Sequence, residues 1–156
     1  IIVILIAFII STYNGLVQSK MKVDNAWSQI DVQLQRRFDL IPNFVETVKG
    51  YMNHEQETFE KITALRSSWA NATSVEDKAK LNNELSSTLK TIMAVSENYP
   101  DLKANENFMK LSEELSNTEN KISFSRQEIL HSLTISSFVN FLFATLILFF
   151  IESLKI

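Results

Sequence analysis

The amino-acid sequence predicts an all-α fold, a long antiparallel bundle of four helices. The 156 residues include only two Gly and two Pro, which leaves little material for the tight turns of a sheet. Between the two ends of the chain, apolar residues recur at intervals of three and four, the period of an α-helix. The absence of cysteine excludes disulfides and thiolate chemistry, and a net charge of −3 argues against nucleic acid as a partner.

The first segment is apolar. Residues 1–10 contain no polar side chain, but a helix that crosses a membrane needs about 20 mostly apolar residues. We therefore expect upstream residues to complete the span, and Ser11, Thr12 and Tyr13 to lie where the helix leaves the lipid. A cleaved signal peptide is the alternative, although no small-residue cleavage pattern follows. Residues 1–12 are predicted to be a retained transmembrane anchor, continuous with the first bundle helix.

The first bundle helix is predicted from a single apolar stripe. Its members are spaced by four, three, four and four residues: Val23, Trp27, Ile30, Leu34 and Phe38. We expect this helix to end at a corner over residues 39–43. Pro42 lacks a backbone donor and disfavours helical dihedral angles at Ile41, which is why the corner is placed there.

Three further helices follow, each of roughly 25 residues, or about 35–40 Å at 1.5 Å per residue. The stripe of the second helix is Phe44, Val48, Tyr51, Met52, Phe59, Ile62, Leu65 and Trp69. After a turn at residues 71–74, Thr73 or Ser74 is expected to cap the third helix, with Glu76 and Asp77 complementing its dipole.

The third helix carries Leu81, Leu85, Leu89, Ile92 and Met93 on one face and is expected to end near Pro100. The fourth begins around residues 103–105, with a stripe of Phe108, Leu111, Leu115, Ile122 and Phe124. Because the connections are short, neighbouring helices should be antiparallel. The predicted bundle covers residues 13–127.

The last segment, residues 128–156, ends in an apolar tail. Residues 132–151 carry no Asp, Glu, Lys or Arg and are rich in Phe, Leu and Ile, so this stretch is long enough to cross a bilayer as a second span. Glu152 and Lys155 would close it with polar groups. A buried helix of a water-soluble protein is a weak alternative, because a small bundle cannot surround a helix that is apolar on every side.

Two acidic motifs superficially suggest metal or acid–base chemistry. His54-Glu55-Gln56-Glu57-Thr58 resembles a zinc-binding helix, but Thr58 stands where the second histidine is needed. Glu113, Glu114 and Glu119 lack the Glu-x-x-His pairs of a di-metal bundle. We interpret both motifs as solvated helix faces.

Arg36 and Arg37, next to Asp39, suggest a phosphate site. At the C-terminal end of a helix, however, these cations would be stabilised by the negative end of the helix dipole and would pair with a carboxylate across the corner. Trp27 and Trp69 fall on inward stripes and are predicted to be core anchors. The sequence therefore predicts no catalytic, cofactor-binding or metal-binding residue, no cofactor, and no enzymatic activity.

Several blocks, in order, resemble the LemA family. They are residues 12–17 (Thr-Tyr-Asn-Gly-Leu-Val), 23–34 (Val-Asp-Asn-Ala-Trp to Leu34), 36–51, 99–108 (Tyr-Pro-Asp-Leu-Lys-Ala-Asn-Glu-Asn-Phe), 113–115 and 119–127. The resemblance covers about residues 1–127 and implies a long antiparallel helical bundle behind an N-terminal membrane helix. It implies no established catalytic activity that can be assigned to particular residues.

From Glu128 the chain departs from the family motifs, which continue with Phe-Tyr-Asn, then Tyr-Asn and a Phe-Pro pair. A shifted reading frame is one explanation, because codons for Leu133-Thr134-Ile135 and Asn140-Phe141-Leu142 can encode Tyr-Asn and Phe-Pro in another frame. A genuine second span is the other. The nucleotide sequence would decide between them.

These inferences predict a bacterial-type protein of the cell membrane, a coiled or bundled helical protein with a structural or protein-interaction role. The alternative is an accessory subunit of a membrane enzyme, such as a membrane protease. The expected partners are the lipid bilayer and proteins of the membrane or envelope, with no nucleic acid and no small-molecule substrate. Lys20 and Lys22 favour a cytoplasmic bundle, although upstream residues can outweigh them.

Overall fold

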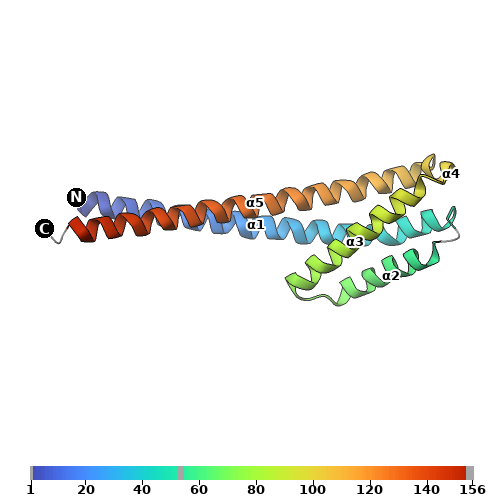
Figure 1. The fold of residues 1–156 in the computed structure, drawn as a ribbon, viewed down its shortest axis with the longest axis horizontal. Coiled ribbons are helices and arrows are strands. Elements are labelled where there is room, and N and C mark those ends of the chain that lie inside the picture. The colour runs from blue at the N-terminus through green and yellow to red at the C-terminus, as the bar shows by residue number, and fades with distance from the viewer. Residues whose placement is uncertain (1, 53–54, 154–156) are drawn as a thin grey trace. The chain divides into compact units, whose positions relative to one another are not determined.

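The computed structural model describes residues 2–52 and 55–153, and these are helical along almost their whole length. The helices are α1 (Ile2–Lys49), α2 (Gln56–Asn71), α3 (Val75–Ser96), α4 (Pro100–Lys103) and α5 (Glu106–Ser153), as Figure 1 shows. No strand occurs in the residues described. The all-helical class is therefore confirmed, with four long helices and one additional short one.

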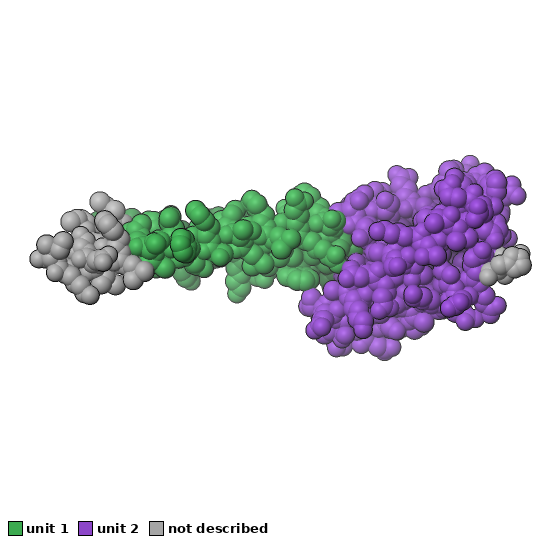
Figure 2. All heavy atoms as spheres, in the orientation of Figure 1, with its two compact units in different colours: residues 1–31, 122–156 green, residues 32–121 purple. Residues whose placement is uncertain are grey.

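The chain divides into two compact units (Figure 2). Unit 1 combines residues 1–31 with residues 122–156, and unit 2 is residues 32–121. Helices α1 and α5 contribute to both units, whereas α2, α3 and α4 belong to unit 2 alone. Unit 2 lies within the expected bundle of residues 13–127 but is shorter than it at both ends.

The predicted corner at residues 39–43 is wrong, because α1 continues through Pro42 to Lys49. A proline inside a helix removes one backbone hydrogen bond and costs about 3 kcal/mol. Four apolar side chains around it, Ile41, Phe44, Val45 and Val48, are buried, and together their burial exceeds that cost. Tertiary packing on one face therefore overrides the local signal of the proline.

The chain turns instead after Lys49. The N–H groups of Tyr51 and Met52 both donate to the oxygen of Val48, at 3.0 Å each, which closes the end of the helix beside Gly50. Helix α2 begins only at Gln56 and has 16 residues, so the expected second helix was too long. Helix α5 has 48 residues and was expected to be about half as long.

The remaining helix ends follow ordinary capping chemistry. Ser74 is the cap of α3, as predicted, and its side-chain oxygen accepts from the N–H of Asp77 at 3.0 Å. Pro100 opens α4 at a position where its missing donor is harmless. The side chain of Asn105 accepts from the N–H of Phe108 at 3.0 Å and so caps α5.

The core of unit 2 is apolar and closely packed, with α2 and α3 lying side by side (Figure 1). Phe38 stacks on Trp69 with ring centroids 4.4 Å apart, and Phe44 stacks on Phe108 at 5.9 Å. The largest side chains that are less than 2% exposed in this unit are Phe38, Phe44, Ile41, Met52, Ile62, Leu85, Ile92, Leu102 and Val48. All of these except Ile41 and Leu102 are predicted stripe residues.

Two predicted core residues are exposed, and both lie in unit 1. Trp27 keeps 43% of its surface accessible and Phe124 keeps 62%. The predicted Ile30, Leu34 and Phe38 of the same stripe are buried, and next to Trp27 it is Ala26 that is buried. A tryptophan attracts attention in a sequence because it is large, but the small Ala26 is what allows close approach here.

Unit 1 consists of the first part of α1 and the last part of α5, which lie side by side and run in opposite directions (Figure 1). Phe8 of α1 stacks on Phe143 of α5, with ring centroids 6.0 Å apart. Most of the other large apolar side chains described in this unit are exposed, among them Ile6, Ile10, Phe138 and Phe141.

Among the residues described, one helix is long and apolar enough to cross a membrane. It is α5, over Glu106–Leu146, and only 11% of its most apolar window is buried. The predicted N-terminal span is not shown, and several of its side chains lie outside the described residues. Length and composition alone are weak evidence for a membrane, and they point here to the C-terminal helix.

Candidate functional site

The most chemically distinctive cluster in unit 2 surrounds Arg37, which is only 3% exposed. Its Nη1 donates to Oδ1 of Asn82 at 2.7 Å and to Oγ of Ser86 at 3.0 Å. The same nitrogen forms an ion pair with Oε2 of Glu119. The hydroxyl of Ser86 lies 3.1 Å from that carboxylate oxygen. Side chains from α1, α3 and α5 thus meet at one guanidinium, and we call these four residues the Arg37 cluster.

The Arg37 cluster holds helices together. Burying a guanidinium is costly unless acceptors surround it, and here a carboxylate, an amide oxygen and a hydroxyl do so. Asn82 is completely buried, and among the residues described its Nδ2 has no hydrogen-bond partner. The sequence led us to expect a carboxylate partner across a corner after this helix; α1 has no corner there, and the carboxylate that pairs with Arg37 is Glu119 of α5.

The neighbouring arginine is different. Arg36 lies 3.5 Å from the carboxylate of Glu114, and their side chains are 54% and 30% exposed. Such a pair contributes little to stability in water. The two arginines therefore lie in different environments. Arg36 is exposed to solvent, whereas Arg37 is surrounded by protein acceptors. The hypothesis of a shared phosphate site receives no support from this geometry.

The remaining sequence candidates are dispersed. His54 lies outside the described residues, while Glu55 precedes α2 and accepts a hydrogen bond from the hydroxyl of Tyr99 at 3.1 Å. Glu119 belongs to the Arg37 cluster, but Glu113 is exposed. Within residues 2–52 and 55–153, no three His, Asp or Glu side chains are arranged to hold a metal ion.

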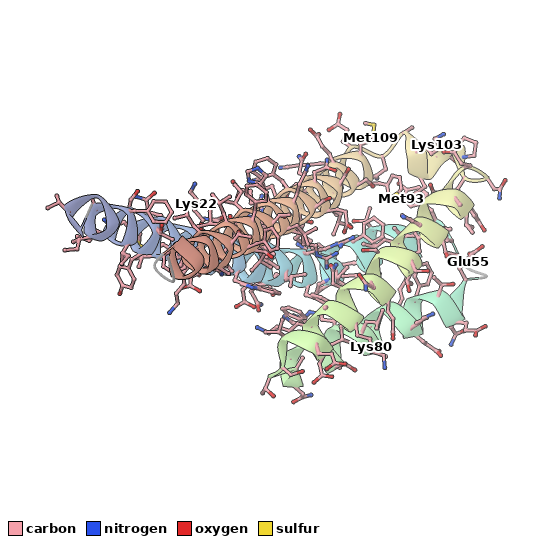
Figure 3. All side chains as sticks on the ribbon, turned by 60° about the vertical axis from the view of Figure 1, so that its left-hand side comes forward. Lys22, Glu55, Lys80, Met93, Lys103 and Met109 are labelled. Carbon is pink, nitrogen blue, oxygen red and sulfur yellow. The ribbon has the colours of Figure 1, made fainter. Side chains whose placement is uncertain are left out.

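A second polar cluster was missed from the sequence. It ties the segment after α1 to the segment between α3 and α5, through Glu55 with Tyr99 and through Tyr51 with Asn105, whose Nδ2 donates to the tyrosine oxygen at 3.0 Å. Figure 3 labels Glu55 at the N-terminal end of α2. Partial burial, and then the adjacent Glu55 carboxylate, raise the pKa of Tyr99, because both disfavour the phenolate. Pairings of 44 and 54 residues in separation give no local sequence signal.

Trp69 anchors unit 2, as predicted. Besides stacking on Phe38, it donates from Nε1 to Oε1 of Gln35 at 3.2 Å, and Nζ of Lys78 lies 5.3 Å from its ring centroid. These three contacts hold the buried indole in place, as expected of a core anchor.

Unit 2 has two open recesses along α2, which meet at Ser67. One has a volume of about 650 Å³ and the other about 540 Å³. Both mix apolar and charged groups, and neither encloses a converging set of catalytic side chains. The first is lined by Lys49, Met52, Gln56, Phe59, Glu60, Thr63, Ala64 and Ser67, and the second by Gln35, Phe38, Asp39, Arg66, Ser67, Trp69, Ala70, Ala72 and Lys78.

A recess of about 550 Å³ lies between α1 and α5 in unit 1, and most of the residues that line it are polar. Lys22, which Figure 3 labels on α1, is a lining residue together with Glu128 and His131 of α5. Gly15 and Ile135 also line it, towards the apolar part of the two helices. We call it the boundary recess, because it lies where the charged residues of both helices begin.

These features define a helical protein in which a bundle with a buried ion pair continues into a pair of exposed apolar helices. Residues 26–149 match the model of the LemA family, and the chain belongs to that family. No curated protein matched the chain. The match begins later than the resembling motifs and runs past Gln127 to residue 149. The alternative reading frame for the tail stays a prediction.

Proposed function

We propose that this LemA family protein is a membrane-anchored helical bundle with a structural or protein-interaction role and no catalytic activity of its own. The observation that supports the proposal is the different placement of the polar groups of unit 2, some of which are buried in the bundle while others are exposed on its surface. The best candidate for ligand chemistry, Arg37, is buried against Asn82, Ser86 and Glu119, and so serves the packing of the bundle. What unit 2 presents outward is a surface of mixed charge.

The anchor in this proposal is the start of α1. Residues 2–19 include no Asp, Glu, Lys or Arg. Val3 is 78% exposed, and Ile6 and Ile10 are each more than half exposed. Apolar side chains that protrude in such density mark a surface that is covered by lipid or by another protein. Lys20 and Lys22 then follow at the level of the headgroups and favour a bundle on the cytoplasmic side.

The working surface in this proposal is the outer face of unit 2. Helices α2 and α3 expose residues of both signs, including Glu57, Lys61, Glu76 and Lys80. Rigid helices that are held by a buried ion pair and by stacked aromatic rings present such residues at fixed positions, which reduces the entropy lost on binding. A protein partner in the membrane or envelope fits this surface.

Photo-crosslinking in intact cells tests the proposal. A photo-reactive residue at exposed Glu57 is expected to give a few discrete protein adducts that an excess of the unsubstituted protein suppresses. The same residue at Ser116, which is exposed on α5, is the matched control for a surface position away from α2. Identical adduct patterns at both positions would indicate random collision and contradict a specific interaction surface.

The adducts also separate the two roles. Stable co-purification of a membrane enzyme from detergent extracts would favour an accessory subunit over a purely structural protein. Catalytic turnover by the purified full chain, without a partner, would overturn the proposal that the bundle lacks chemistry.

A further inference from the structure

We propose that the ends of α1 and α5 cross the lipid bilayer together, as an antiparallel two-helix hairpin with its water boundary at Lys20, Lys22, Glu128 and His131. The inference rests on the proposed membrane anchor and adds a second span, a register and a boundary. Its partner is the hydrocarbon interior of a bilayer. The first argument is the length of the uncharged stretches.

Both helices contain a long stretch without Asp, Glu, Lys or Arg. On α5 this stretch covers residues 129–151, and on α1 residues 2–19 include none of these side chains. At 1.5 Å per residue the stretch on α5 corresponds to about 34 Å. The hydrocarbon core of a bilayer is about 30 Å thick, so α5 is long enough to cross it. The uncharged residues of α1 lie beside this stretch, where Phe8 stacks on Phe143.

The register of the two helices aligns their charge boundaries. Phe8 stacks on Phe143, which fixes which residues are level in this antiparallel pair. Twelve residues further along α1 is Lys20, and twelve residues back along α5 is His131. The boundary recess confirms this register, since Lys22 and Glu128 line it together. The charged residues of both helices therefore begin at the same depth, as a membrane surface requires.

The exposed apolar side chains of α5 indicate that lipid, and not water, surrounds this part of the helix. Six large side chains beyond the boundary are between 46% and 68% exposed, and at 3.6 residues per turn they are spread over more than half of the circumference of the helix: Leu133, Ile135, Phe138, Phe141, Leu142 and Leu146. A water-soluble pair of helices would bury its apolar stripe and expose polar residues. A protein partner would cover one face, whereas a bilayer covers every face that α1 leaves open.

Three threonine hydroxyls inside the two stretches are satisfied without water. The hydroxyl of Thr12 donates to the oxygen of Phe8 at 2.9 Å, and the hydroxyl of Thr145 donates to the oxygen of Phe141 at 2.6 Å. Thr134 does the same with Leu130. In lipid, where no water is available, such back-bonding to the helix is the usual solution.

One small residue of the proposed spans, Ser132 of α5, is buried and lines the recess between the two helices. Helices in membranes associate through small residues, because lipid provides no hydrophobic driving force between them. Since the chain between the two stretches must return to the side it left, the proposal places all of unit 2 on one side of the membrane.

Single-cysteine labelling of the full chain in isolated membranes tests the hairpin, because the natural sequence contains no cysteine. The variants are Ile10→Cys, Phe141→Cys, Glu152→Cys and the exposed control Glu57→Cys. A water-soluble maleimide should label Glu57→Cys and Glu152→Cys from opposite faces. It should fail to label Ile10→Cys and Phe141→Cys even after both faces are opened, until detergent is added.

Four results would contradict the hairpin. If Phe141→Cys labels as fast as Glu57→Cys while Ile10→Cys stays protected, α5 does not span, and the single-anchor proposal survives. If both label and the protein does not sediment with membranes, the proposed membrane anchor fails as well. If both stay protected in a protein that remains in the supernatant, another protein covers the helices. Labelling of Glu152→Cys from the same face as Glu57→Cys would also exclude a crossing.

Discussion

Unit 1 and unit 2 are built from the same two long helices but distribute their side chains in opposite ways. Unit 2 buries Phe38, Phe44 and Ile62 and leaves charged residues outside. Unit 1 exposes Phe138 and Phe141 and buries the small polar Ser132. The comparison teaches that helical periodicity alone does not fix which side of a helix is covered. The residues between the stripes decide it, because they are charged in one unit and apolar in the other.

The largest effect is expected from breaking the one buried ion pair described in unit 2. Arg37→Met removes the cation from Glu119 and leaves Asn82 without its donor, which should destabilise the protein by about 3 kcal/mol. The value is at the lower end of the usual range because the Glu119 side chain keeps 42% of its surface in contact with solvent. Urea unfolding of the detergent-solubilised full chain, followed by circular dichroism, measures the change.

The neighbouring arginine is the control for that experiment. Arg36→Met removes an exposed pair and should cost less than about 1 kcal/mol. The double variant R37M/E119L should recover much of the stability, since apolar side chains of similar size can replace a buried pair. Equal losses in R36M and R37M would contradict the assignment of a structural role to Arg37.

A charge in unit 1 tests the lipid environment. Phe141→Lys places an ammonium group near the middle of the proposed span, which should disfavour membrane insertion by about 2.5 kcal/mol. The fraction of protein recovered in alkali-washed membranes is the measurement. Met109→Lys is the matched control, because Met109 is 52% exposed on the same helix but belongs to unit 2 (Figure 3). Similar recovery of both variants would mean that residue 141 faces water.

A smaller effect is expected at the cap of α3. Ser74→Ala removes the oxygen that accepts from the N–H of Asp77 and should destabilise the protein by about 1 kcal/mol. Ser67→Ala, at an exposed position within α2, should have almost no effect. Thermal unfolding of the two variants compares them, and an equal shift in their midpoints would show that the cap contributes nothing.

The smallest effect is confined to alkaline pH. Because the pKa of Tyr99 is raised by partial burial and by Glu55, the folded state keeps the phenol proton at a pH where the unfolded state has lost it. The contribution is complete below the ordinary tyrosine pKa of about 10 and is lost as the pH rises through the folded value. Above pH 10 the midpoint of thermal unfolding should therefore decrease less steeply with pH in Tyr99→Phe than in the unsubstituted protein.

Tyr13→Phe is the matched control for the alkaline experiment, because Tyr13 is 67% exposed and belongs to unit 1. This variant should keep the alkaline fall of the unsubstituted protein. If it flattens the profile as much as Tyr99→Phe does, the effect does not come from the Glu55–Tyr99 hydrogen bond.

The fold class and most of the core could be predicted, since period alone places Val48, Ile62, Leu85 and Leu115 on buried stripes and each is buried. The corner at Pro42 could not, because the local cost of proline was weighed without the burial of Ile41 and Phe44 on either side of it. Trp27 was wrongly placed on the buried stripe that Ile30, Leu34 and Phe38 do form. Trp27 carries the larger apolar surface, but contact with a neighbouring helix favours Ala26.

The polar clusters were beyond prediction for a different reason. Arg37 joins Asn82 and Glu119 across separations of 45 and 82 residues, and no local pattern encodes such a pairing. The doublet Arg36-Arg37 could be recognised as unusual, but only the packing shows that one arginine is buried and the other exposed. The sequence interpretation looked for the carboxylate partner across the expected corner, whereas the buried Arg37 takes its acceptor from α5.

The central claim is that α5 leaves water for lipid near Glu128. Nitroxide labels placed one at a time along residues 116–146 of the reconstituted protein test it by collision with dissolved oxygen and with a water-soluble nickel reagent. The account predicts frequent nickel collisions at outward positions before Glu128, and frequent oxygen with rare nickel collisions at Phe138, Phe141 and Leu142. Nickel collisions that continue undiminished to Leu146 would contradict it.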